Sequence, residues 1–293
     1  MDLLSIDSLS DAQIERILGR SEHFFEGNRA GEISAVLNGK IVFNVFYENS
    51  TRTAMSFATA AHRLGASALS LSVEHSSVKK GETLEDTATT LNAMRPDALV
   101  IRHRENGAPA RVAKIMEAPV INAGDGANEH PTQALLDAAT IRHRFGRVEG
   151  LKVAICGDIR HSRVARSNAK LLPRLGGEVR LAGPPDLMPD DIPRLSIDDA
   201  IRGADVVMML RVQRERLETE LGDAPGEYLD RYGLTSQRLA TAVPGAVVMH
   251  PGPMNRGVEI ADSIADDPRC SLIALQVEMG VATRMACLEM LLS

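Results

Sequence analysis

Four arginines stand where a folded chain could gather positive charge around a small anion. Each ends a short apolar run or closely follows one, and they are Arg52, Arg102, Arg163 and Arg211. A guanidinium presents a planar fork of N–H donors that matches phosphate and carboxylate oxygens. If the apolar runs are parallel strands, their carboxyl ends meet at the edge where α/β proteins bind ligands. The four positions therefore predict a crevice for substrates that carry several negative charges.

The segment around Arg52 lies between an expected strand and an expected helix and reads F-Y-E-N-S-T-R-T. Ser50, Thr51 and Thr53 could cap that helix and direct its backbone N–H groups outward, and helix N-termini bind phosphate through such groups. An ordinary Ser/Thr cap beside a surface arginine explains the same residues. Taken alone, the segment favours the ordinary cap.

A second loop, Asn122–Gln133, carries glycines and leads into a helix that begins at Pro131. His130 and Gln133 are three residues apart at the helix start and share a face. Their side chains could donate hydrogen bonds to a substrate carbonyl or amide. A histidine that merely caps the helix explains the position equally well.

Two further loops are weaker signals. His75–Glu82 is polar and basic, and by itself it is better explained as a solvated loop. Met249–Pro253 follows the last apolar run and contains two X-Pro steps, which favour a rigid, extended turn. Such a turn could present backbone carbonyls to a ligand amide.

The elements that must position these residues form a regular alternation. Eight apolar runs predict strands at Lys40–Tyr47, Ser67–Ser72, Ala98–Arg102, Pro119–Asn122, Lys152–Cys156, Glu178–Ala182, Asp205–Leu210 and Ala246–His250. Amphipathic stretches predict helices at Thr53–Leu64, Thr83–Met94, Pro131–His143, Val164–Leu175, Ser196–Gly203 and Val281–Leu292. This alternation predicts an α/β fold with two doubly wound parallel-sheet domains joined by helices, divided at the glycine-rich segment Phe145–Gly150.

The composition agrees with two globular domains. The chain has 293 residues, of which 44% are hydrophobic and 25% charged. Its net charge is −6, aromatic residues make up 3% and tryptophan is absent, which argues against a general nucleic-acid-binding protein. No apolar run reaches the ~18 residues that a membrane span needs.

The cysteines and histidines argue against redox and metal chemistry. Cys156, Cys270 and Cys287 form no C-x-x-C pair, and an odd number suits a reducing compartment. The eight histidines are scattered singly, and the chain starts without a secretory signal pattern. We therefore expect a complete cytoplasmic protein with no bound metal, no cofactor, no nucleic acid and no membrane partner.

The pattern also lacks a protein nucleophile. No serine or cysteine stands in a triad-like arrangement with histidine and aspartate, and no carboxylate pair suits glycoside chemistry. The expected site is electrostatic.

Taken together, these segments resemble the aspartate/ornithine carbamoyltransferase family. The resemblance rests on six motifs: S-T-R-T at Ser50–Thr53, S-S-V-K-K-G-E at Ser76–Glu82, R-H at Arg102, H-P-T-Q at His130–Gln133, R-V-Q-x-E-R at Arg211–Arg216 and H-P-G-P at His250–Pro253. It covers essentially the whole chain. The last two motifs favour aspartate as the acceptor, because ornithine-type chains typically carry H-C-L-P, with a cysteine at the position of Pro251, and an S-M-G motif not found here.

The resemblance implies a set of contacts with carbamoyl phosphate. The phosphate is held by four residues of the first motif: Ser50, Thr51, Arg52 and Thr53. The carbonyl oxygen is polarised by Thr53, Arg102 and His130. The carbamoyl NH₂ group is held by Gln133 and by the backbone around Pro251, Gly252 and Pro253.

The acceptor site and the oligomer follow from the same resemblance. Arg163 and Arg211 bind the two carboxylates of aspartate, and Gln213 supports them. Ser76 and Lys80 come from the adjacent chain of a homotrimer, so that each active site is shared. A regulatory or dihydroorotase-type chain is a further partner that the resemblance allows for.

The implied reaction transfers the carbamoyl group to the amine of L-aspartate, giving N-carbamoyl-L-aspartate and phosphate for de novo pyrimidine (UMP) biosynthesis. Residues 1–146, with the C-terminal helix 278–293, would bind carbamoyl phosphate, and residues 147–277 would bind aspartate. Three alternatives stay open: a carbamoyltransferase for ornithine or another amino acid, a catalytically silent scaffold subunit, and a nucleotide-binding α/β protein. The last would need a G-x-G-x-x-G or G-x-x-x-x-G-K-[ST] element, and neither occurs.

Overall fold

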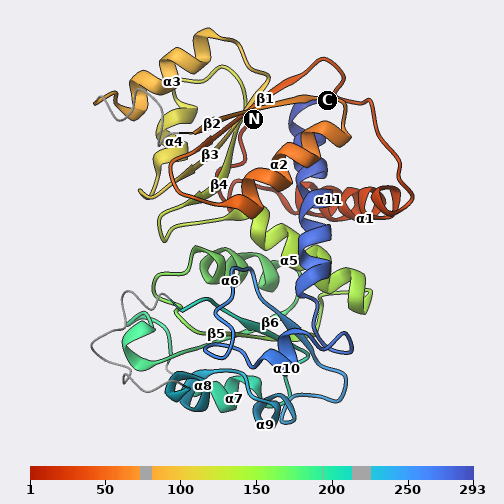
Figure 1. Ribbon diagram of the computed structural model, residues 1–293, viewed down its shortest axis with the longest axis vertical. Helices are drawn as coiled ribbons and strands as arrows, with labels where there is room; N and C mark the ends of the chain where they lie inside the picture. The colour runs from red at the N-terminus through yellow and green to blue at the C-terminus, as the bar shows by residue number, and fades with distance from the viewer. Residues whose placement is uncertain (73–80, 194, 213–225) are drawn as a thin grey trace. The chain divides into compact units, whose positions relative to one another are not determined.

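The structure, a computed structural model, describes residues 1–72, 81–193, 195–212 and 226–293 and divides into two compact units. The first unit comprises Met1–Ala139 and Val277–Ser293, and the second comprises Thr140–Gln276. Each contains one four-stranded parallel sheet with helices packed on it (Figure 1). Two helices connect the units through the chain: α5 (Pro131–Phe145) and α11 (Ile273–Leu292). The predicted α/β class with two parallel sheets is confirmed.

The sheet of the first unit has the strand order β2-β1-β3-β4. Its strands are β1 (Ile41–Phe46), β2 (Ser67–Ser72), β3 (Ala98–His103) and β4 (Val120–Asp125). The chain moves outward from β1 to β2 and then returns past β1 to β3, so the direction of winding reverses between β1 and β3. In open α/β sheets, ligands bind at the carboxyl ends of the strands at such a reversal.

Helices cover both faces of this sheet. They are α1 (Asp11–Arg29), α2 (Thr51–Arg63), α3 (Leu84–Ala93), α4 (Ala108–Ala113) and the first unit's parts of α5 and α11. In Figure 1, α3 and α4 lie on one side of the strands and α1, α2 and α11 on the other. Alternate strand residues such as Val45, Leu99 and Ile101 form a buried cluster with Val112 of α4, as expected for strands buried on both faces.

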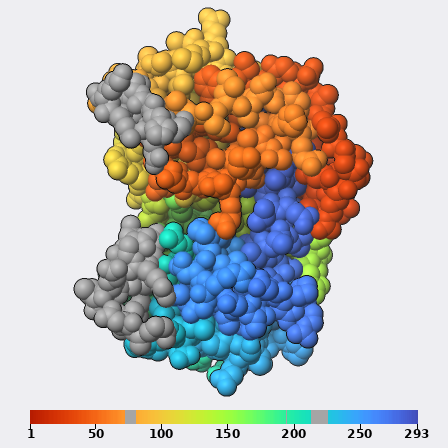
Figure 2. All heavy atoms as spheres, in the orientation of Figure 1, coloured from red at the N-terminus to blue at the C-terminus, as the bar shows by residue number. Residues whose placement is uncertain are grey.

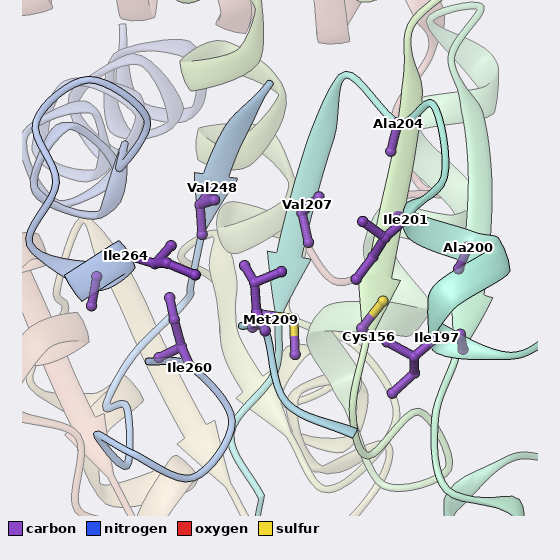
Figure 3. Packing of buried hydrophobic residues seen from close by; sticks show 14 residues of the cluster. Cys156, Ile197, Ala200, Ile201, Ala204, Val207, Met209, Val248, Ile260 and Ile264 are labelled. Atoms are coloured by element: carbon purple, nitrogen blue, oxygen red, sulfur yellow. The ribbon is translucent and has the colours of Figure 1, made fainter. Parts of the chain in front are cut away.

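The second unit repeats the arrangement with the order β6-β5-β7-β8. Its strands are β5 (Lys152–Cys156), β6 (Glu178–Ala182), β7 (Val206–Met209) and β8 (Val247–Met249), and its helical segments are α6 (Arg163–Arg174), η3 (Pro185–Leu187), α7 (Ile197–Ile201), α8 (Glu227–Tyr232), α9 (Ser236–Leu239) and α10 (Asp262–Ala265). Figure 3 shows Val207, Met209 and Val248 of the sheet packed with Ile201 of α7 and Ile264 of α10. Here the winding reverses between β5 and β7.

The structure differs from the sequence-based expectation mainly at α1, a 19-residue helix that was not predicted, and at the last and shortest helices. α11 begins at Ile273 rather than at Val281 and runs through Gly280. A Cβ atom at Gly280 would stand 2.8 Å from Arg284 Nη1 and 3.3 Å from Leu136 Cδ2, so tertiary packing, not helix propensity, requires glycine there. The short helices α4, α8, α9 and α10 are too brief to show a helical period in the sequence. None of the helices in the described ranges combines the length and the apolar character of a membrane span.

Candidate active site

The turn after β1 exposes the N-terminus of α2. Ser50 is the N-cap residue, but its side chain makes no capping hydrogen bond, so the expectation of a hydroxyl cap at Ser50 is wrong. Its carbonyl instead accepts the first helical bond, from Ala54 N at 3.0 Å. The first turn contains no acidic residue, and Thr51 and Arg52 are exposed. The early N–H groups and the positive end of the helix dipole are therefore available to an external anion.

Arg102 lies beside this turn. It occupies β3 directly opposite Phe46, the last residue of β1. Its Nε stands 3.2 Å from Glu48 Oε2 in an ion pair whose two side chains are 15% and 29% exposed, and its Nη1 donates to Ala123 O at 3.3 Å. A partly buried guanidinium therefore lies next to the exposed N-terminus of α2, where the winding of the first sheet reverses.

His130 and Gln133 follow β4, the next strand along. Both are buried, with 3% and 8% of their surface exposed, and Gln133 N donates to His130 O at 2.9 Å. The side-chain amide of Gln133 donates to Asp137 Oδ1, one helical turn further along α5, at 2.9 Å. Since β1, β3 and β4 are consecutive in the sheet, the α2 turn, Arg102 and the His130 loop lie at one edge.

A buried carboxylate fixes the loop that ends at His130. Asp125 Oδ1 accepts from Asn122 Nδ2 at 2.8 Å and from Glu129 N at 3.1 Å, and its Oδ2 accepts from Gly107 N at 2.7 Å and from Asn128 Nδ2 at 3.0 Å. Four hydrogen bonds to one buried carboxylate make the approach to α5 rigid.

Two predicted site arginines occupy the corresponding edge of the second sheet. Arg163 is the first residue of α6, whose N-cap Ser162 accepts from Ala165 N at 3.1 Å. Arg211 is exposed and lies two residues after β7. β5 and β7 are neighbouring strands. Gly157, directly after β5, has φ +134°, and a Cβ atom added to it would lie 3.0 Å from Leu210 Cβ and O. Glycine therefore allows the two strand ends to lie this close. Both arginines therefore flank the winding reversal of this unit.

The turn at Pro251–Pro253 is held by a buried pair. His250 Nδ1 accepts from Gly252 N at 2.9 Å, so the ring proton belongs on Nε2, which donates to Glu259 Oε1 at 3.2 Å. Both side chains have no exposed surface. Glu259 Oε1 also accepts from Asn255 N, and His250 N donates to Gln276 Oε1 at 2.8 Å. The turn is thereby anchored on both sides.

The predicted site residues thus fall into two groups, one in each unit. The first unit brings together Ser50, Thr51, Arg52, Thr53, Arg102, His130 and Gln133. The second contains Arg163, Arg211, Gly252 and Pro253. Ser76, Lys80 and Gln213 lie outside the described residues.

Family models cover both units. One, described as the carbamoyl-P binding domain of aspartate/ornithine carbamoyltransferase, matches residues 1–143, and another, described as the Asp/Orn binding domain, matches residues 149–291. The chain belongs to the aspartate/ornithine carbamoyltransferase family. The resemblance inferred from the six motifs is therefore confirmed.

Relatives from this family match over nearly the full chain. The aspartate carbamoyltransferase catalytic subunit of Granulibacter bethesdensis is 55% identical, with 99% of this chain and 94% of the relative covered. Aspartate transcarbamoylase from Trypanosoma cruzi, solved with carbamoyl phosphate and aspartate, has a TM-score of 0.88 at 32% identity, covering 100% and 95% of the two chains. Ornithine carbamoyltransferase from Pyrococcus furiosus has a TM-score of 0.89 at 28% identity, covering 99% and 96%. The backbone is therefore shared by enzymes for both acceptors.

Three of the buried carboxylates near the predicted site residues escaped the sequence analysis: Asp125, Asp137 and Glu259. Asp125 stands between two glycines and Glu259 between two β-branched apolar residues. An acidic residue in apolar or glycine-rich surroundings is the signal that could have found Asp125, the last residue of β4, and Glu259. Asp137 follows Gln133 at the i, i+4 spacing, which is the pattern of a side-chain hydrogen bond on one helix face.

His103, next to Arg102, gives a pH prediction. Its ring lies 4.6 Å from that of Tyr47, its Nδ1 accepts from Glu105 N at 3.0 Å, and burial holds its pKa below the usual value. As the pH falls through about 6.5, the unfolded chain takes up a proton at this histidine before the folded protein does, so the free energy of unfolding decreases. Urea unfolding from pH 7.5 to 5.5 should show a smaller decrease for His103→Gln than for the wild type. Replacing the exposed His62 is the control, and equal decreases in wild type and His103→Gln would contradict the assignment.

Proposed function

We propose that the chain is the catalytic chain of an aspartate carbamoyltransferase. In this proposal the amine of L-aspartate attacks the carbonyl carbon of carbamoyl phosphate, and the products are N-carbamoyl-L-aspartate, which serves pyrimidine biosynthesis, and phosphate. One observation carries the proposal. The N-terminus of α2, which is exposed and has no acidic residue in its first turn, lies at the same edge of the first sheet as Arg102 and His130, where the winding reverses. The full-length similarity to aspartate carbamoyltransferase catalytic subunits supports the same acceptor.

The first unit is the proposed carbamoyl phosphate site. The N–H groups and hydroxyls of Ser50–Thr53, with the Arg52 guanidinium, hold the phosphate oxygens. Arg102 is paired with Glu48, so the carbonyl oxygen of carbamoyl phosphate competes with that carboxylate for the guanidinium. Gln133 already donates one amide hydrogen to Asp137, which leaves its carbonyl oxygen oriented to accept from the carbamoyl NH₂ group.

The chemistry proposed for this site is electrostatic. When the amine nitrogen bonds to the carbonyl carbon, negative charge develops on the carbonyl oxygen, where Thr53, Arg102 and His130 donate. Such donors commonly supply the largest catalytic contribution, with roughly 2.7–4 kcal/mol lost for each donor removed. The C–O bond to phosphate then breaks, and the departing phosphate accepts the proton of the amine. No covalent bond to the protein forms, and no cofactor takes part.

The second unit is the proposed aspartate site. Arg163 and Arg211 flank the winding reversal of its sheet and offer two guanidinium forks for two carboxylates, with Gln213 in support. The turn at Gly252 and Pro253, anchored by the hydrogen bond from Gly252 N to His250 Nδ1, supplies the backbone carbonyls that the proposal assigns to the carbamoyl NH₂ group.

We propose further that the enzyme is a cytoplasmic homotrimer in which Ser76 and Lys80 complete the site of the adjacent chain. The first unit has an apolar surface suited to a second copy. Leu69, on the edge strand β2, is 55% exposed, and Met55, on the neighbouring helix α2, is 61% exposed. Figure 2 shows α2 (orange) at the surface of this unit. Three free cysteines agree with a reducing compartment. Native mass spectrometry of the complex would detect a bound regulatory or dihydroorotase-type chain as mass beyond that of three copies.

A product assay tests the proposed reaction. Purified protein supplied with carbamoyl phosphate is expected to form N-carbamoyl-L-aspartate from aspartate and no citrulline from ornithine, with one phosphate released per product. Citrulline as the main product would replace the proposal by an ornithine enzyme, and absence of both products would favour the silent scaffold.

Arg211 gives a prediction for acceptor binding. Arg211→Ala is expected to raise the KM for aspartate roughly ten- to hundred-fold, because a lost charge-assisted hydrogen bond costs about 1.5–3 kcal/mol. Binding of carbamoyl phosphate should stay unchanged in calorimetric titrations. The matched control is Arg202→Ala, which removes an exposed arginine that pairs only weakly with Asp199, at 4.0 Å. Unchanged aspartate kinetics in Arg211→Ala would show that the carboxylates bind elsewhere.

A further inference from the structure

Arg284 is an arginine buried in the interior of the first unit. It lies on α11, only 4% of its surface is exposed, and its guanidinium stands 5.1 Å from the ring centre of Phe57. Its Nη1 donates to Ser56 Oγ at 2.8 Å and to Gly280 O at 3.2 Å. In the described part of the chain no carboxylate forms an ion pair with Arg284, and its Nε has no hydrogen-bond partner.

A buried guanidinium without an ion-pair partner is costly, and most proteins avoid it. Burial lowers the pKa of Arg284 to about 10, and the nearby Asp137 offsets only part of this effect. The side chain therefore carries a full positive charge at neutral pH. Packing alone therefore explains this buried charge poorly.

A glycine on the same helix makes room for the Arg284 guanidinium. Gly280 lies one turn before Arg284 on α11, and a Cβ there would come within 2.8 Å of Nη1. A Cβ atom at Gly280 would also lie 3.3 Å from Leu136 Cδ2 of α5 and 3.8 Å from Ser56 Oγ of α2, so the glycine leaves room for both side chains. Three helices thus converge on this guanidinium.

Two of these helices carry proposed carbamoyl phosphate residues. Ser56 follows Arg52 at the i, i+4 spacing on α2, so the two lie on one face about one turn, ~5.4 Å, apart. On α5, Asp137 accepts the hydrogen bond from Gln133. Arg284 therefore contacts α2 one turn after Arg52 and lies near Asp137, the partner of Gln133.

We propose that Arg284 is a positioning residue for carbamoyl phosphate: it fixes α2 against α11 and adds buried positive charge behind the helix end that takes the phosphate group. The inference rests on the proposed function of the first unit. The charge strengthens the pull of the α2 N-terminus on a dianion through an interior in which water screens little. The hydrogen bond from Arg284 to Ser56 fixes the position of α2 along its axis, so that its N-terminal N–H groups meet the phosphate oxygens.

Calorimetric titration with inorganic phosphate tests this role directly. Arg284→Gln keeps side-chain donors but loses the charge, and its dissociation constant for phosphate is expected to rise about tenfold. Arg284→Lys keeps the charge and should stay within about threefold of the wild type. In assays, the KM for carbamoyl phosphate should rise in Arg284→Gln, while the KM for aspartate at saturating carbamoyl phosphate should not.

A second arginine that binds the same helix is the matched control. Arg20 of α1 makes two hydrogen bonds to Glu289 of α11, at 2.7 and 2.8 Å, and its guanidinium lies 4.5 Å from the ring centre of Phe24. Arg20→Met should lower thermal stability and leave phosphate affinity unchanged. If Arg284→Gln does not fold, Ser56→Ala takes its place, and removing this acceptor should weaken phosphate binding about threefold.

The outcomes separate the inference from the function on which it rests. A folded Arg284→Gln, or Ser56→Ala in its place, that binds phosphate as tightly as the wild type would overturn the role of Arg284. A wild-type protein that binds phosphate and yet forms no N-carbamoyl-L-aspartate would overturn the proposed function, and the comparison of phosphate affinities would still stand.

Discussion

Arg52→Ala and Lys80→Ala homotrimers are each expected to lose at least about a hundredfold in turnover, and a mixture refolded together is expected to regain activity. Each site of the proposed trimer takes Arg52 from one chain and Lys80 from the next. Any mixed trimer then contains one site in which both residues are intact. Equal mixing should restore about one quarter of the wild-type activity, because most trimers are mixed and one site in three is whole.

A second mixture controls this experiment. Arg52 and Arg102 belong to the same chain's part of the site, since Phe46 and Arg102 are paired residues of adjacent strands. Refolding Arg52→Ala with Arg102→Ala therefore creates no intact site and should stay inactive. If the Arg52→Ala and Lys80→Ala mixture forms hybrid trimers, identified by native mass spectrometry, and remains inactive, each chain builds its site alone.

His130→Ala is expected to lower kcat by about 10²–10³, the usual loss when one donor to a developing oxyanion is removed. The ring is 3% exposed and follows a loop that Asp125 holds with four hydrogen bonds, so its position is fixed before substrate binds. Residual activity should be measurable, because in the proposed site Arg102 and Thr53 still donate to the same oxygen. His130→Asn, which restores an N–H donor, should recover part of the loss.

Added imidazole distinguishes the two chemical roles of this histidine. A donor of the oxyanion-hole type is not replaced by a base in solution, so His130→Ala should gain no activity from imidazole. Complete loss of activity that imidazole restores would identify His130 as the base that takes the proton of the amine. His62→Ala, at an exposed position near the end of α2, controls for the loss of a histidine as such.

The fold could be predicted because its signals are local. The strands Ser67–Ser72, Lys152–Cys156 and Glu178–Ala182 have the predicted bounds, since each is a short apolar run ended by glycine or a polar turn. Parallel pairing and winding then place the strand ends, and with them Arg102, at the ligand-binding edge. The residues proposed to contact ligand were accessible to the same argument because their positions follow from the strands.

The support behind the site could not be predicted in this way. The positions of Asp125 and Glu259 carry a sequence signal, but the partners of Asp125, Glu259 and Arg284 are distant in sequence or defined by loop geometry, and no periodicity marks such contacts. The N-terminal extension of α11 was missed because Gly280 signals a helix end in sequence, whereas in the fold it marks the contact with α2 and α5. The hydroxyl cap was wrong because Ser50 adopts φ −153° and ψ 78°, from which its side chain makes no capping bond.

The tie between α2 and α11 also sets an order of events during synthesis. Ser56 and Arg284 are 228 residues apart, so at the usual rates of translation roughly ten to fifty seconds separate their emergence from the ribosome. The second unit is one continuous segment, Thr140–Gln276, and it can close within that interval. The first unit cannot, because Val277–Ser293, which contain most of α11, belong to it and are made last. A nascent chain stalled before α11 therefore has an unfinished first unit, and we expect such truncated chains to be the ones that chaperones hold.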